Sequence, residues 1–87
     1  MSTQEALFRK TYQPQNSLRV EEIVSGATTT TYIGDATIGT LEAGPRWQIR
    51  KIVVTVVDTV TTTSVYFPNG KDDYAFIWSD RASLTYL

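Results

Sequence analysis

A chain of 87 residues is a single domain at the small end of what folds unaided, since it buries only about 60 to 65% of its unfolded surface. It contains no Cys, which excludes a disulfide framework and a thiolate metal site and leaves oligomerisation as the usual source of extra stability. A net charge of −1 with 20% charged residues argues against a polybasic nucleic-acid binder and against an acidic disordered tail.

The chain is expected to divide into an N-terminal arm, residues 1–16, and one β domain, residues 17–87. The arm has no basic n-region and no apolar h-region, and no apolar run in the chain approaches the roughly 18 residues of a membrane span. We therefore expect a soluble protein without a cleavable signal.

The arm carries a weak helix signal. Ser2 and Glu5 have capping-box spacing, which predicts one or two helical turns before Pro14 stops them. Leu7 and Phe8 are adjacent large apolar side chains that an arm ordered by contact would insert into a neighbour. A frayed terminus is the alternative, with about equal weight.

A hairpin is expected next. Leu18 to Val24 alternates weakly as a strand does, Ser25-Gly26 breaks it, and Thr28 to Ile33 has the composition of a partner strand. Glycines and a Gly-Pro pair then interrupt residues 34–45, which predicts loops and at most a short strand over 36–40.

The segment from Ile52 to Trp78 predicts three strands joined by two-residue turns at Asp58-Thr59 and Asn69-Gly70. These turns set a register in which the large side chains share one face, and that face is the predicted core. The predicted opposed pairs are Val56 and Thr61, Val54 and Thr63, Ile52 and Val65, then Val65 and Tyr74, Thr63 and Phe76, and Thr61 and Trp78.

The inward parity changes within the strand that begins at Trp47. Trp47 and Ile49 alternate with polar residues, whereas Ile52 and the valines at 54 and 56 have the opposite parity. A β-bulge at Arg50-Lys51 would produce this switch, and two separate strands are the alternative.

After Trp78, Ser79-Asp80 can cap one helical turn over residues 81–83, leaving a hydrophobic tail of Leu84, Tyr86 and Leu87. The predicted fold class is therefore all-β: a small antiparallel meander or sandwich, or a partial barrel, with an extended or briefly helical N-terminal arm.

The second face of the predicted sheet is too apolar for free solvation and too small-sided for an ordinary core. We expect the first hairpin, the arm or another subunit to cover it, and a small sandwich with a two-sided sheet is the alternative. The hypothesised assembly interface consists of Leu7, Phe8, Val53, Thr55, Val57, Val60 and Thr62.

No residue pattern points to catalysis. The absence of His removes His-based triads and His zinc sites, and no phosphate-binding or dinucleotide-binding glycine motif occurs. Asp72, Asp73 and Asp80 could form a carboxylate pair, and Asn69 with the first two could bind calcium, but solvated turn residues are the favoured interpretation. We expect no enzyme, no metal, no cofactor and no small-molecule substrate.

A basic patch surrounds Trp47, formed by Arg46, Arg50 and Lys51. Such a patch can stack single-stranded bases, but it is small and a Trp is more often a core residue. Nucleic acid is therefore a disfavoured partner.

A family resemblance runs through four segments, and its most specific marks are two motifs, residues 47–52 and residues 80–86. Thr30-Thr31-Tyr32-Ile33-Gly34, Trp47-Gln48-Ile49-Arg50-Lys51-Ile52, the Thr/Val-rich hairpin and Phe76-Ile77-Trp78-Ser79-Asp80-Arg81-Ala82-Ser83-Leu84-Thr85-Tyr86 resemble a group of small uncharacterised proteins of tailed bacteriophages. The resemblance covers about two thirds of the chain and excludes the arm, and no catalytic residue carries over from it. It implies phage origin and a place in the virion.

The sequence thus favours a non-catalytic structural component of a tailed-phage virion, made in the host cytoplasm. Its expected partners are copies of itself and other virion proteins, on the capsid surface as decoration or at the tail, baseplate or fibre base, with no membrane involved. The alternative is a small host-directed module that binds protein or nucleic acid during infection.

Overall fold

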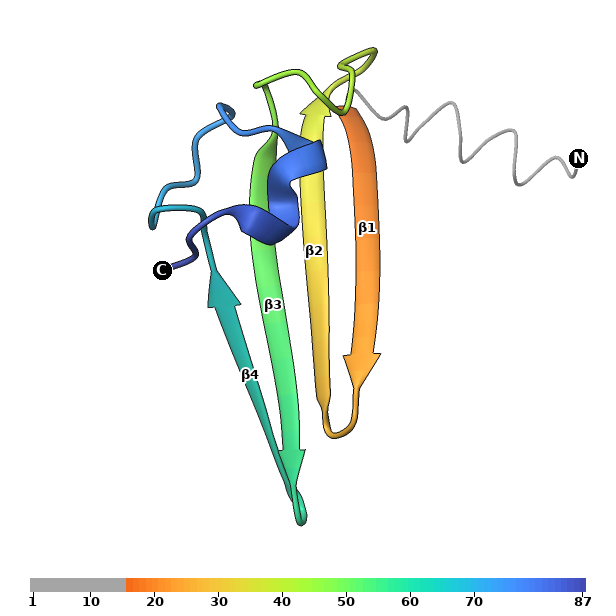
Figure 1. The fold of residues 1–87 in the computed structure, drawn as a ribbon, viewed down its shortest axis with the longest axis vertical. Helices are drawn as coiled ribbons and strands as arrows, with labels where there is room; N and C mark the ends of the chain where they lie inside the picture. Colours follow the sequence, from red (N-terminus) through yellow and green to blue (C-terminus); the bar gives the residue numbers. More distant parts are fainter. Residues whose placement is uncertain (1–15) are drawn as a thin grey trace, which may run out of the picture.

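The computed structural model describes residues 16–87, which form a four-stranded antiparallel sheet. The strands pair in sequence order, as Figure 1 shows: β1 (Asn16–Ser25), β2 (Thr28–Thr37), β3 (Gln48–Val57) and β4 (Val60–Tyr66). The rest of the chain after β4 folds back over one face of the sheet and contains a 3₁₀ helix, η1 (Trp78–Ser83). The sheet is open, and the predicted all-β meander is confirmed.

Two tight turns set the register of both outer hairpins. Gly26 and Asp58 have positive φ angles of 59° and 56° at the first loop position, which suits the twist of the flanking strands. Val56 pairs with Thr61 across the second turn, and the predicted pairs at 54 and 52 follow. The predicted first hairpin is also present, with both strands longer than expected.

The predicted bulge at Arg50-Lys51 is wrong. Every residue of β3 from Gln48 to Thr55 pairs in continuous register with β2, and the pairing with β4 is equally regular. Parity is therefore constant along β3, and Trp47 and Ile49 point to the face opposite Ile52. The sequence needs no bulge because β3 carries apolar side chains on both faces.

The predicted third strand of the meander is also wrong. The Asn69-Gly70 turn forms, with φ angles of 53° and 70° and the Lys71 amide donating to the Pro68 carbonyl at 2.9 Å. The chain beyond it does not pair with β4; Phe76 instead exchanges backbone hydrogen bonds of 2.9 and 3.0 Å with Trp47.

Phe76 and Trp78 thereby pack into the core, whereas Tyr74 is 53% exposed. Tyr74, Phe76 and Trp78 are not opposite Val65, Thr63 and Thr61. Pro68 contributes to this outcome, because it has no N–H to continue the ladder of β4. It forms an isolated bridge with Tyr86 instead.

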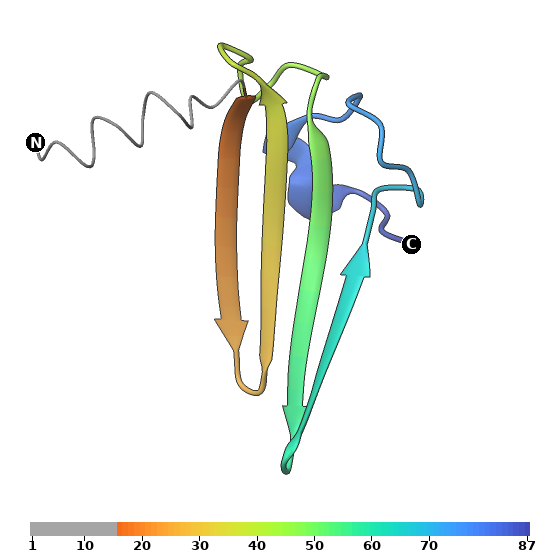
Figure 2. The same ribbon diagram turned by 180° about the vertical axis from the view of Figure 1, so that it is seen from behind.

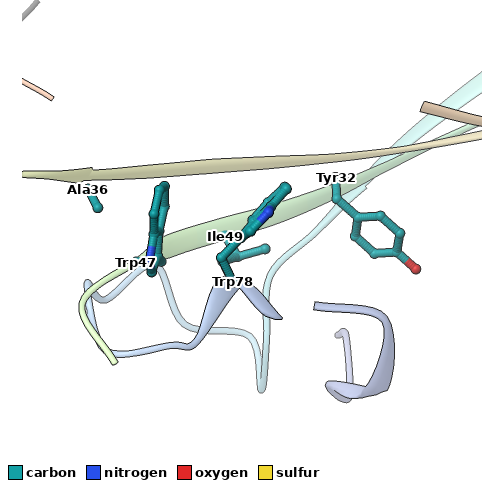
Figure 3. Close-up of a cluster of buried hydrophobic side chains, with 5 residues drawn as sticks. All are labelled: Tyr32, Ala36, Trp47, Ile49 and Trp78. Carbon is teal, nitrogen blue, oxygen red and sulfur yellow. The ribbon is translucent and has the colours of Figure 1, made fainter. Parts of the chain in front are cut away.

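The core lies between one end of the sheet and the C-terminal segment (Figure 3). Its buried side chains are Tyr32, Ala36, Trp47, Ile49 and Trp78, and Phe76, Leu84 and Tyr86 pack against them. The two indole rings are tilted with centroids 5.9 Å apart. They fit because position 34 is glycine: a Cβ there would overlap Cε3 of Trp78 and lie 3.1 Å from Cε3 of Trp47.

Strand alternation divides the sheet into two faces. The capped face carries the core and, farther along the strands, Val53, Thr55, Val57, Val60 and Thr62. The open face carries the apolar residues Leu18, Val20, Val24, Ile33, Ile52, Val54, Val56 and Val65, together with Thr29, Thr31, Thr61 and Thr63. Figure 2 shows the open face, across which no drawn strand or helix of residues 16–87 runs.

Candidate interaction surfaces

The C-terminal segment is attached to the sheet by a specific ion pair. Nε and Nη2 of Arg81 donate to the two carboxylate oxygens of Glu21 at 2.8 and 3.0 Å, a bidentate arrangement, and the guanidinium carbon lies 4.6 Å from the ring centroid of Trp78. The hydrogen bond from Arg81 lowers the pKa of Glu21, and the same bond raises the pKa of Arg81. The pair holds η1 against β1.

Tyr86 is a second attachment point. Its hydroxyl donates to the carbonyl of Arg81 at 2.7 Å, and its ring packs 5.9 Å from that of Tyr32. Lys51 lies over the Tyr86 ring at 5.4 Å. Burial raises the pKa of Tyr86 to about 12, with a further contribution from Tyr32. These contacts are structural and leave no reactive group exposed.

The predicted interface residues on the sheet are brought together on the capped face. Thr55 is opposite Thr62 and Val57 is opposite Val60, beyond the edge of the C-terminal segment. Val57 is 62% exposed and Val60 60% exposed, whereas Val53 is half-buried. Leu7 and Phe8 lie outside the described residues. Whether this surface binds another chain stays a prediction.

The open face is a larger apolar surface that the sequence interpretation did not assign to an interface. The exposed fractions are 61% for Val20, 66% for Val24, 43% for Val56 and 52% for Val65. Ile33, Ile52 and Val54 are half-buried along the middle strands. No strand or helix of residues 16–87 covers these side chains (Figure 2).

A signal for this surface is present in the sequence. Trp47, Ile49, Val53 and Val57 share one parity, and an uninterrupted strand places them together, opposite Ile52 and its neighbours. The prediction assigned the aromatic residues 74, 76 and 78 to the Ile52 side instead, and it explained the opposite parity of Trp47 and Ile49 by a bulge or by two separate strands.

The basic patch around Trp47 does not form. Trp47 is 0% exposed and its indole N–H donates to the Leu41 carbonyl at 3.0 Å. Arg50 lies on the open face, while Lys51 lies on the capped face over Tyr86. A buried indole with cations on opposite faces is no platform for stacking bases.

The carboxylates of the turn region do not converge. Asp72 and Asp73 are exposed, and the Asp72 carbonyl accepts a 2.9 Å hydrogen bond from the Gln48 amide. Among residues 16–87, no group of three or more His, Cys, Asp or Glu side chains could hold a metal ion. The described part of the chain also has no helix long and apolar enough to cross a membrane.

A shallow depression of about 420 Å³ lies in the loop between β2 and β3. It is lined by Thr37, Ile38, Gly39, Thr40, Leu41, Gly44 and Arg46, and it is open to solvent. Arg46 is the one ionisable group of this lining, so that the depression lacks an acid and base pair.

The two edges of the sheet differ in charge. β1 carries Arg19, Glu21 and Glu22, whereas β4 from Val60 to Tyr66 contains neither charge nor proline. Charged residues on an edge discourage pairing with other strands, and their absence permits it. The β4 edge therefore suits strand addition.

Comparisons with known proteins add no assignment. No protein-family model matches the chain, and no curated protein and no solved structure matches it.

Proposed function

We propose that this protein is a non-catalytic structural component of a tailed-phage virion, an oligomeric accessory on the capsid surface or at the tail, baseplate or fibre base. The open face carries the proposal, because a sheet face with exposed valines on β1, β3 and β4 suits contact with another chain. Surface burial and backbone pairing can hold such an accessory without a cofactor.

The family resemblance supports phage origin, and the structure accounts for its motifs in physical terms. Trp47 and Ile49 of the first motif are core residues, and Arg81 and Tyr86 of the second attach the C-terminal segment. Such motifs preserve a fold and carry no chemistry. They are therefore compatible with a scaffold whose work is done by its surfaces.

The composition of purified particles tests the proposal. We expect mass spectrometry of gradient-purified infectious virions to find this chain at stoichiometric level with the known structural proteins, and labelled electron microscopy to place it on the head or tail. Particles that contain no copies would refute the virion role. A chain that is abundant in infected-cell lysate and absent from particles would support the alternative.

That alternative is a host-directed module that binds a protein during infection. The uncharged β4 edge favours it, because strand addition recruits a partner through main-chain hydrogen bonds. The burial of Trp47 removes the support for single-stranded nucleic acid as the partner.

A further inference from the structure

We infer that the open face binds a second copy of this chain, with two sheets packed face to face around a two-fold axis. The inference rests on the proposed function, because it names the partner of an oligomeric accessory. It concerns the face opposite the interface predicted from sequence.

The chemistry of the open face suits contact with another sheet. Its apolar members are β-branched residues on all four strands plus Leu18, and the threonines between them present methyl groups. β-Branched side chains on a pleated face interdigitate well with another pleated face, as in a sandwich with sheets about 10 Å apart. Burial of such a face removes apolar surface from water, which favours association.

The area of the open face is near that of a protein interface. β1, β2 and β3 have ten residues each, about 33 Å at roughly 3.3 Å per residue, and β4 has seven, about 23 Å, with neighbouring strands about 4.8 Å apart. The resulting footprint is about 600 Å², and side-chain relief raises its accessible area toward the roughly 800 Å² per partner of a stable interface. The area of one sheet face is therefore close to what a dimer needs.

Few charged residues lie on the open face: Glu22 on β1, Asp35 on β2 and Arg50 on β3, with a net charge of −1. In an isologous contact the same patch meets itself, so this low net charge keeps the repulsion between copies small. Asp35 lies nearer the end of the face, where the Tyr74 hydroxyl approaches it at 3.5 Å.

The shape of the capped face disfavours the alternative orientation. Its C-terminal segment stands above one end of the sheet, with its Trp78 and Tyr86 packed into the core, and forms a step on that face. A second flat sheet laid there would meet that step. The open face has no such obstruction from any drawn strand or helix of the described chain (Figure 2).

Adjacent threonines on β4 provide a matched test. Thr63 faces outward on the open face and Thr62 on the capped face, and both are exposed. Lysine at either site has the same β propensity and charge, so that Thr63→Lys and Thr62→Lys differ only in the face they alter. Sedimentation equilibrium of the full chain should give a dimer, with the dissociation constant raised at least about 30-fold by Thr63→Lys. Thr62→Lys should leave it within about threefold of the wild-type value.

Single cysteines give a second measurement that is less perturbing, because the natural chain has none. In Thr63→Cys, thiol labelling should slow as protein concentration rises, whereas in Thr62→Cys the rate should be independent of concentration. This readout remains valid if Thr63→Lys fails to fold.

Three results would overturn the inference. The first is a wild-type chain that stays monomeric up to millimolar concentration. Protection of the thiol in Thr63→Cys at every protein concentration would belong with this result, because it would mean that another part of the same chain covers the face. The second is dissociation by Thr62→Lys and not by Thr63→Lys, which would place association on the capped face. The third is equal labelling of both cysteines. None of these depends on particle composition, so failure of the virion role and failure of this interface are separate results.

Discussion

The two faces of this sheet differ in side-chain size and in what covers them. The capped face is completed by two tryptophans, and a glycine opposite them leaves room for their rings. The open face carries valine, isoleucine and threonine, and its outermost valines remain more than half exposed, as at Val20 and Val24. Large aromatic side chains bury enough apolar area to hold a segment that is distant in sequence against the sheet. Small β-branched side chains form a flat surface that suits another sheet.

The comparison implies that the monomer depends on one face only. Trp47→Ala removes a fully buried side chain and should lower the free energy of unfolding by about 3 to 5 kcal/mol. Val56→Ala is the matched change on the open face and should cost less than about 1 kcal/mol. Urea titration at low protein concentration measures both. Equal costs would mean that the open face is also part of the monomer core.

Glycine at position 34 should be nearly as important as the tryptophans. Gly34→Ala places a methyl group against Trp78 and should destabilise the fold by about 1 to 3 kcal/mol, with altered near-ultraviolet circular dichroism. In a Trp78→Leu background the same change should cost much less, because the overlap is gone. A double-mutant cycle measures this coupling. Additive costs would show that the glycine does not serve the indole.

An alkaline titration tests how much Tyr86 stabilises the packing of the C-terminal segment on the sheet. Burial raises the pKa of Tyr86 from 10.0 to about 12, so the folded state favours the neutral phenol. The resulting stability is fully present below pH 10 and is lost as the pH rises toward 12. Tyr86→Phe should flatten this part of the profile of urea midpoint against pH. An unchanged profile in the variant would assign the alkaline loss to other groups.

The smallest expected effect on stability is that of the ion pair between Glu21 of β1 and Arg81 of η1. Arg81 lowers the pKa of Glu21 below its ordinary value of 4.5, so this stability is present above pH 4.5 and is lost as the pH falls through the depressed value. The difference in unfolding midpoint between wild type and Glu21→Gln should therefore shrink in acid and in high salt. Glu22→Gln removes a carboxylate from the neighbouring position on the open face and serves as the control. A difference that persists at low pH would contradict the assignment.

Local chemistry made the hairpins predictable. Ser25-Gly26, Asp58-Thr59 and Asn69-Gly70 each favour a turn through their own backbone preferences, and period-two alternation then sets the register. The register of β3 with β4 follows from these signals, whereas the first hairpin turns at Gly26-Ala27, one residue later than the predicted break at Ser25-Gly26.

The choice of face was not predictable in the same way. Apolar residues occupy both parities of β3, so alternation cannot say which side Phe76 and Trp78 join. Phe76 and Trp78 pack against Gly34 and Trp47, which lie far away in sequence. No local pattern indicates that position 34 must be glycine. The predicted interface residues of β3 and β4 share one face, but another apolar face lies behind them.

The C-terminal position of Trp78 and Arg81 affects how the protein folds during synthesis. The Glu21–Arg81 pair joins residues 60 positions apart, and Trp78 reaches the sheet only after all four strands have been made. Contacts of such long sequence separation slow folding, because loop closure must precede the contacts that reward it. During that interval the uncharged β4 edge and both faces of the hairpins are exposed to other nascent chains. Docking of the C-terminal segment onto the sheet therefore competes with strand pairing between neighbouring chains.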